Sequence, residues 1–174
     1  MVDLQKPVWL LDVDGVLNVD DPGRWGGTLA YGYATAAGRS VLLQWMPPLI
    51  SRIHALHAFG LVEARWSTTW CAYADELERL WELPQLGRAF TEPLTGDAAA
   101  SAKLATARSV RADGRRLIWS DDLETPTDGP VYEELTGGGH ALLIRPDSWV
   151  GLQPDDLDAI ETFAVRHTSA EAAG

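Results

Sequence analysis

The sequence contains a single cysteine, Cys71, and no long apolar run. One thiol cannot form an intramolecular disulfide or a cysteine-built zinc site, which fits a reducing compartment, and Cys71 itself is best explained as a small buried side chain. The apolar stretch near the N-terminus is short and is interrupted by two aspartates, so it predicts neither a signal peptide nor a membrane span. We therefore expect a cytoplasmic protein with no membrane partner.

Basic residues are also scarce. The chain has 14 lysines and arginines against 25 aspartates and glutamates, and its formal net charge is -11 at pH 7. A field of this sign repels polyanions and so disfavours tight binding of nucleic acid. A length of 174 residues with 46% hydrophobic content fits one core. We expect a single domain at residues 1–167 and a flexible tail at 168–174.

Short apolar runs alternate with helical patterns along the chain. Strands are expected at residues 8–11, 61–66, 117–119 and 141–144, and helices at 47–59, 73–83, 98–111 and 154–165. Residues 18–45 carry turn signals and are expected to form a loop or short hairpin that acts as a flap, and residues 90–96 a short strand and turn. The alternation predicts an α/β fold: a three-layer, Rossmann-like domain with a doubly wound, mainly parallel sheet.

Polar side chains follow three of the expected strands. They are Asp12 and Asp14 after the first strand, Ser67, Thr68 and Thr69 after the second, and Asp121 and Asp122 after the third. In open parallel sheets, ligands bind outside the carboxyl ends of the strands. These side chains are therefore expected to share one site, although the hydroxyls and the later aspartates could instead cap helices.

The two first aspartates suggest a particular chemistry. Asp12 and Asp14 alternate along an extended chain, which places both carboxylates on one side, where they repel unless a cation or a proton intervenes. Mg²⁺ prefers oxygen ligands, so Asp12, Asp121 and Asp122 could hold it. A carboxylate that attacks phosphorus needs a second acid for the leaving oxygen, and a hydroxyl and an ammonium, such as Lys103, for the phosphate charge.

Four short motifs occur in order along residues 8–144. They are DVDGVLN at 12–18, WSTTW at 66–70, Lys103 within a helix, and WSDD at 119–122. Together they closely resemble the motifs of the haloacid dehalogenase (HAD) superfamily. The two tryptophans of the second motif, with Arg145-Pro146-Asp147 and Gly151-Leu152, further resemble the small, capless bacterial HAD domains grouped with RNA-repair proteins.

The resemblance implies roles for individual residues. Asp12 would be the nucleophile and Asp14 the general acid/base, with Thr68 favoured over Ser67 as the phosphate-binding hydroxyl and Lys103 favoured over Arg108 as the cation. Mg²⁺ would be held by Asp12, the carbonyl of Asp14, and Asp121, with Asp122 in support. Further substrate contacts are expected from Asn18, Ser67 and Thr69. The loop residues Asp20, Asp21, Arg24 and Trp25 are either specificity determinants or an ordinary polar loop.

These expectations point to a Mg²⁺-dependent phosphomonoester phosphatase that forms an aspartyl-phosphate. A capless site is open to a small molecule or to a macromolecular end. The resemblance to HAD domains grouped with RNA-repair proteins favours a nucleotide or nucleic-acid end, whereas the negative net charge argues against a long polyanion. Two alternatives stay open at this level. The chain could be a HAD-fold, Mg²⁺-binding interaction module with little turnover, or a phosphoryl transferase similar to the mutases. The sequence gives no oligomeric state.

Overall fold

A parallel sheet forms the centre of the structure, a computed structural model that describes residues 5–170, with side chains described as far as Arg166. Its five strands lie in the order β5-β4-β1-β6-β7, and every pairing is parallel. The strands are β1 (Val8–Leu11), β4 (Glu63–Trp66), β5 (Gly87–Arg88), β6 (Leu117–Ser120) and β7 (Ala141–Ile144). The predicted α/β class and parallel sheet are confirmed.

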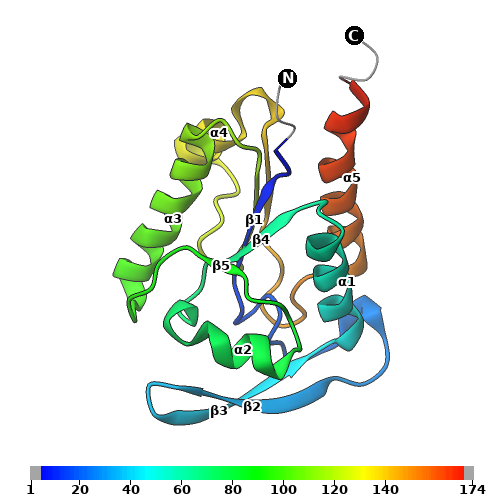
Figure 1. Cartoon of the computed structure of the whole chain (residues 1–174), viewed down its shortest axis with the longest axis vertical. Helices are drawn as coiled ribbons and strands as arrows, with labels where there is room; N and C mark the ends of the chain where they lie inside the picture. The colour runs from blue at the N-terminus through cyan, green and yellow to red at the C-terminus, as the bar shows by residue number, and fades with distance from the viewer. Residues whose placement is uncertain (1–4, 171–174) are drawn as a thin grey trace.

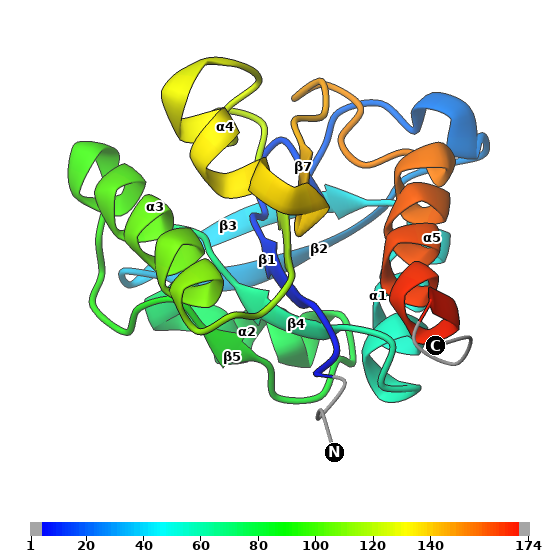
Figure 2. The same cartoon turned by 90° about the horizontal axis from the view of Figure 1, so that it is seen from above.

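Helices cover both faces of this sheet (Figures 1 and 2). Their bounds are α1 (Pro47–Ala58), α2 (Ala74–Leu80), α3 (Gly96–Ala112), α4 (Gly129–Thr136) and α5 (Pro154–Ala170), with 3-10 turns at Gly23–Trp25, Cys71–Tyr73 and Gly137–Gly139. On one face α3 contacts β6 and α4 contacts β7, while on the other α1 contacts β4 and α5 contacts β7. The arrangement is three-layered and Rossmann-like.

The central strand β1 explains why the sheet needs both layers. All four of its side chains are buried, and alternate residues face opposite sides. Val8 and Leu10 pack in a cluster with Ala107 of α3, whereas Trp9 belongs to the larger cluster on the α1 and α5 side. A strand that is apolar on both faces is stable only where helices cover both, as is typical of parallel sheets.

The segment expected as a loop or short hairpin is a hairpin of two seven-residue strands, β2 (Ala30–Ala36) and β3 (Arg39–Trp45). Its turn residues, Ala37 and Gly38, both have positive φ angles (50° and 74°), which suits a tight two-residue turn between antiparallel strands. The hairpin packs beside α2, where the backbone N–H of Thr35 donates to a carboxylate oxygen of Glu76 at 3.0 Å.

Helix α4 and strand β5 differ from the sequence prediction. The Pro/Gly-rich composition predicted no helix at Gly129–Thr136, but Pro130 lies in the first helical turn, where a missing N–H breaks no helical bond. Strand β5 occupies Gly87–Arg88 rather than the predicted region 90–96. It is a strand because Gly87 and Arg88 pair with β4, and such pairing leaves no local pattern in the sequence.

Two helix ends also differ from their predicted positions. Helix α2 ends at Leu80 instead of residue 83, because the chain turns at Glu82, whose φ of 52° is not helical. Helix α5 continues to Ala170 and so includes the first residues of the predicted tail, while residues 171–174 lie outside the described residues. Within residues 5–170, no helix is both long and apolar enough to cross a membrane.

Candidate active site

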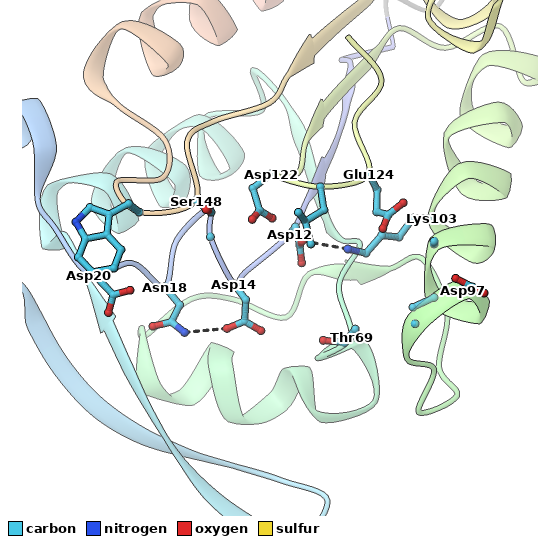
Figure 3. Close-up of a pocket in the computed structure, with 16 residues that line it drawn as sticks. Asp12, Asp14, Asn18, Asp20, Thr69, Asp97, Lys103, Asp122, Glu124 and Ser148 are labelled. Carbon is cyan, nitrogen blue, oxygen red and sulfur yellow. Dashed lines mark hydrogen bonds and ion pairs between the residues drawn. The ribbon is translucent and has the colours of Figure 1, made fainter. Parts of the chain in front are cut away.

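A cavity of about 630 Å³ opens where strands β1 and β6 end (Figure 3). In the pairing of β1 with β6, Leu11 lies opposite Ser120. The residues that follow the two strands, Asp12 and Asp121, therefore lie side by side at this edge. The cavity is lined by the side chains or backbone of Asp12, Asp14, Gly15, Asn18, Asp20, Thr69, Gly96, Asp97, Ala99, Ala100, Lys103, Asp122, Leu123, Glu124, Ser148 and Trp149. No described residue of the β2–β3 hairpin is among them.

Asp12 lies at the bottom of this cavity and is only 7% exposed. Its backbone N–H donates to the carbonyl of Ser120 at 3.0 Å, and its Oδ1 accepts the N–H of Val13 at 2.8 Å. Burial raises the pKa of Asp12 to about 7, with a further contribution from the charge of Asp121, and Lys103 opposes the shift. Burial and the charge of Asp121 therefore favour the protonated form of this carboxyl group, and the contact with Lys103 favours the ionised form.

Lys103 reaches the same point from helix α3 and is 5% exposed. Its Nζ donates to Oδ2 of Asp12 at 3.0 Å and to Oδ2 of Asp121 at 2.7 Å. Burial lowers the pKa of Lys103, but the two carboxylates outweigh it and hold the pKa above its usual value. The alternative cation, Arg108, lies on the surface in a bidentate pair with Glu134 and does not line the cavity.

Asp12, Asp121 and Asp122 form a group that could hold a metal ion, because each offers one oxygen within 4.8 Å of the others. Asp121 is fully buried, and its Oδ1 accepts the N–H groups of Leu123 and Glu124 at 2.9 and 2.7 Å. It therefore also caps the loop after β6, not a helix as the alternative interpretation had it, because the next helix begins only at Gly129. The Asp122 carboxylate accepts no side-chain or backbone bond from another described residue, and burial and Asp121 raise its pKa.

Gly15 makes room for Asp122. A Cβ added at Gly15 would lie 2.2 Å from Oδ2 of Asp122, and the φ of Gly15 is +72°, a conformation that side chains disfavour. The glycine of the first motif is therefore required both by the turn after β1 and by the close approach of a carboxylate from the loop after β6.

Asp14 is exposed and points away from the metal-ligand group. Its Oδ1 accepts from Nδ2 of Asn18 at 2.8 Å, and its Oδ2 accepts from Nε1 of Trp70 at 3.1 Å. The three-aspartate group does not include the Asp14 carboxylate, so a metal contact from this residue, as the resemblance implies, would have to use its carbonyl. Two neutral donors on separate elements fix the orientation of the carboxylate.

Asn18 lines the cavity, but both polar atoms of its side chain have protein partners. Besides the bond to Asp14, its Oδ1 accepts the backbone N–H of Gln44 in strand β3 at 2.9 Å. The position expected to contact substrate therefore connects Asp14 to the hairpin. Sequence analysis missed Trp70 as the second partner of Asp14, since the two residues are 56 positions apart.

The three consecutive hydroxyls differ in exposure. Ser67 and Thr68 are fully buried, whereas Thr69 is exposed and lines the cavity. Thr68, which the sequence favours, accepts the N–H of Trp70 on Oγ1 at 3.3 Å. Ser67 follows Trp66, which is in register with Leu11, so it lies level with Asp12, and its buried Oγ has no described hydrogen-bond partner.

The polar loop at residues 20–25, which follows the first motif, makes most of its contacts with the chain after β7. Arg24 forms an ion pair with Asp155, and Nε1 of Trp25 donates to the carbonyl of Leu152 at 2.8 Å. Asp21 accepts the N–H of Gly23 at 2.8 Å, which leaves Asp20 as the member that lines the cavity.

The cavity also has lining residues that sequence analysis did not single out, notably Asp97, Glu124, Ser148 and Trp149. Ser148 and Trp149 follow β7, so the strand-end rule that located the other groups would have found them as well. The edge of the sheet thus combines the buried carboxylate of Asp12, the buried ammonium of Lys103, a group of carboxylates that could hold a metal ion, and the exposed carboxylate of Asp14.

Comparison with models of protein families, with curated proteins and with solved structures finds no match to this chain.

Proposed function

We propose that this chain is a Mg²⁺-dependent phosphohydrolase that cleaves phosphomonoesters through an aspartyl-phosphate on Asp12. The observation that carries the proposal is the contact of Asp12 with Lys103 at the bottom of a cavity that Asp14 also lines. Phosphoryl transfer through a covalent intermediate needs a nucleophile, charge stabilisation and a separate acid, and this cavity offers a side chain for each.

The residues divide the reaction between them. An oxygen of Asp12 forms a bond to phosphorus while the bond from phosphorus to the alcohol oxygen breaks, and Asp14 gives that oxygen a proton. Asp14 then takes a proton from water, which attacks phosphorus, releases phosphate and regenerates Asp12. The bonds from Asn18 and Trp70 support this role because they hold the Asp14 carboxylate in one orientation while it is exposed to the cavity.

The carboxylate oxygens of the metal-ligand group suit a hard cation such as Mg²⁺. When bound, the ion would neutralise these carboxylates and the oxygens of the phosphate. Asp121 already accepts three bonds, from Leu123, Glu124 and Lys103. Asp12 accepts two, from Val13 and Lys103, and Asp122 accepts none from another described residue, so Asp122 and then Asp12 are the better direct ligands. We assign Asp121 mainly to holding Lys103 and the loop after β6.

Partners for the phosphate oxygens are expected from Lys103 and from the segment 67–69. Thr69 has the exposed hydroxyl, and the unpartnered Oγ of Ser67 lies level with Asp12. An orphaned buried hydroxyl is rare in proteins and often marks a functional position. Separate Ser67→Ala, Thr68→Val and Thr69→Val variants, compared by KM and kcat, identify the one that contacts phosphate.

The proposal is tested by hydrolysis of an aryl phosphate with Mg²⁺, with EDTA, and with Asp12→Asn as the blank. We expect turnover that needs both the metal and Asp12, and a covalently phosphorylated chain when the reaction is quenched in acid. Activity in Asp12→Asn close to that of the unaltered chain would exclude the nucleophile. Binding of Mg²⁺ without any turnover would favour the interaction module, and phosphate that appears on an added alcohol rather than in solution would favour a transferase.

A further inference from the structure

The charges on the wall of the cavity are unevenly balanced. Six carboxylates line it, and Lys103 is the one cation among the described lining residues. The carboxylates are those of Asp12, Asp14, Asp20, Asp97, Asp122 and Glu124. The proposed reaction uses Asp12, Asp14 and Asp122, so three carboxylates in the wall have no role in it.

These three carboxylates, of Asp20, Asp97 and Glu124, come from separate elements. Asp20 follows the first motif, Asp97 lies in the first turn of α3, and Glu124 follows β6. Figure 3 shows Asp20 on one side of Asp12 and Asp14, and Asp97 and Glu124 on the other. All three are exposed, and within the described chain none of their side chains makes a hydrogen bond or an ion pair.

The three carboxylates do not make a second metal site. Among the described residues, the group of Asp12, Asp121 and Asp122 is the one whose ligand atoms are close enough to share an ion. The charge of Asp97 is offset in part by the positive end of α3. Asp20 and Glu124 have no such compensation, so they set a negative potential over the entrance from two sides.

Trp149 adds an aromatic surface at the same entrance. It lines the cavity and is 59% exposed, although its backbone is well fixed. Its carbonyl accepts the N–H groups of Asp20 and Asp21, each at 3.1 Å, and its own N–H donates to Asp147 at 2.8 Å. The backbone of Trp149 is thus bonded to that of Asp20, an aspartate whose side chain has no described partner. Both residues line the cavity, and an exposed indole face and a carboxylate each attract a cation.

We infer that the phosphomonoesters taken by this cavity carry a positive charge on the alcohol portion, close to the phosphate. The phosphate would lie at Lys103 and the metal-ligand group, and the cation at Trp149 and the carboxylate of Asp20, while Glu124 adds negative potential from the other side of the cavity. A small amino alcohol and a phosphorylated peptide with neighbouring basic side chains supply this same chemistry. Nucleotides with several phosphates and nucleic-acid ends bring further negative charge to a negative wall and are disfavoured. The inference rests on the proposed function.

The direct test compares two esters of equal shape. Phosphocholine has a positively charged quaternary nitrogen where 3,3-dimethylbutyl phosphate has a neutral carbon. A difference in kcat/KM between the two esters therefore reports the effect of the charge alone. We expect phosphocholine to be favoured by about tenfold or more at low salt, and the preference to shrink as salt rises. Equal rates on the pair, or a preference for nucleoside monophosphates, overturns the inference. Phosphopeptides with flanking arginine or flanking glutamate then tell the peptide source from the small-molecule source.

Variants locate the preference. Asp20→Asn and Trp149→Ala should each bring the ratio of kcat/KM for the two esters closer to one, and Trp149→Phe, which keeps an aromatic face, should keep more of it. Asp128→Asn is the matched control, because Asp128 is exposed, has no described side-chain partner and lies outside the cavity wall. If the ratio in Asp20→Asn and Trp149→Ala equals that of the control, the cation is not bound where we place it.

A binding measurement separates recognition from turnover. Calorimetric titration of the Asp12→Asn chain with the same two esters, in Mg²⁺, should give the lower Kd for phosphocholine. Failure of the inference and failure of the proposed function differ in outcome. If an aryl phosphate is hydrolysed with dependence on Asp12 but the two esters behave alike, the inference alone falls; if no phosphomonoester is hydrolysed, both fall.

Discussion

The ammonium of Lys103 lies between two buried carboxylates, 3.0 Å from Oδ2 of Asp12 and 2.7 Å from Oδ2 of Asp121. Lys103 lies in α3, whereas Asp12 and Asp121 follow β1 and β6. The ion pairs among them therefore bind the helix to the edge of the sheet. A buried charge that loses its partner is costly, whereas a satisfied one is roughly neutral for stability. The lysine is therefore as much a requirement of the fold as of the proposed chemistry.

Replacing Lys103 by methionine should lower the free energy of unfolding by about 3–5 kcal/mol at pH 7, because two carboxylates stay buried without their cation. Urea unfolding followed by circular dichroism measures the loss. Arg108→Met on the same helix is the control, since its pair with Glu134 is exposed and solvent screening leaves such pairs little effect on stability. Equal losses in the two variants would contradict the buried arrangement.

Binding of Mg²⁺ should depend on pH through Asp12. In the metal-free fold its pKa is raised from 3.8 to about 7, chiefly by burial, so folding favours the protonated form. The stability that this group contributes is present below about pH 4 and is lost as the pH rises through about 7. A metal needs the ionised form, so the affinity should rise with pH up to about 7 and then level off.

The pH dependence is measured by calorimetric titration with Mg²⁺ between pH 5.5 and 8 in two buffers with different ionisation enthalpies. Below pH 7, the difference in heat between the buffers gives the number of protons released, which should approach one. Asp12→Asn should release none from this position. A Kd that does not change across the range would mean that Asp12 is already ionised in the metal-free protein.

The sheet edge that carries the candidate site could be predicted from the sequence because its signals are local. An apolar run ends at Asp12, another ends just before Asp121, and a parallel sheet brings such ends together. The position of Lys103 within a helix was also predictable, but not its double contact, since that depends on how α3 packs across the sheet. Burial of the segment 67–68 likewise follows from packing and not from composition.

The contacts that hold Asp14 and the entrance could not be predicted in this way. The indole N–H of Trp70 donates to Asp14, which is 56 positions away in the sequence. The backbone N–H of Asp20 donates to the carbonyl of Trp149, so a loop near the start of the chain is bonded to one near its end. Helix α4 was missed because glycine and proline dominate its first turn, where neither is costly. In each case the tertiary fold, not a local pattern, decides the structure.

The indole N–H of Trp70 should matter for the role of Asp14. Trp70→Phe keeps a ring in the core but removes the 3.1 Å bond to Oδ2 of Asp14, so this carboxylate loses one of its two fixed donors. We expect kcat to fall about tenfold, with a shifted pH profile for kcat and a smaller change in KM. Trp81→Phe is the control, because Trp81 is equally buried and its indole N–H has no described partner. An unchanged pH profile in Trp70→Phe would assign the bond to stability alone.

Gly15 provides the sharpest test of the metal-ligand group. In Gly15→Ala the new Cβ would meet Oδ2 of Asp122, 2.2 Å away in the unaltered fold, and the turn has a φ of +72°. Gly38→Ala has the same backbone problem, at a φ of +74°, but nothing lies within 4 Å of its Cβ position. Both variants should lose about 1 kcal/mol of unfolding free energy from the backbone conformation.

Only Gly15→Ala should also weaken Mg²⁺ binding, by about tenfold or more, because Asp122 must move away from Asp12 and Asp121 while those two stay in place. Calorimetric Kd values for Mg²⁺, measured beside the unfolding free energies, separate the two effects. Gly38→Ala accounts for the cost of the backbone, so any excess loss of affinity in Gly15→Ala reports the displaced carboxylate. If both variants bind Mg²⁺ as the unaltered chain does, Asp122 does not hold the ion, and Asp121 must supply the ligand from the loop after β6.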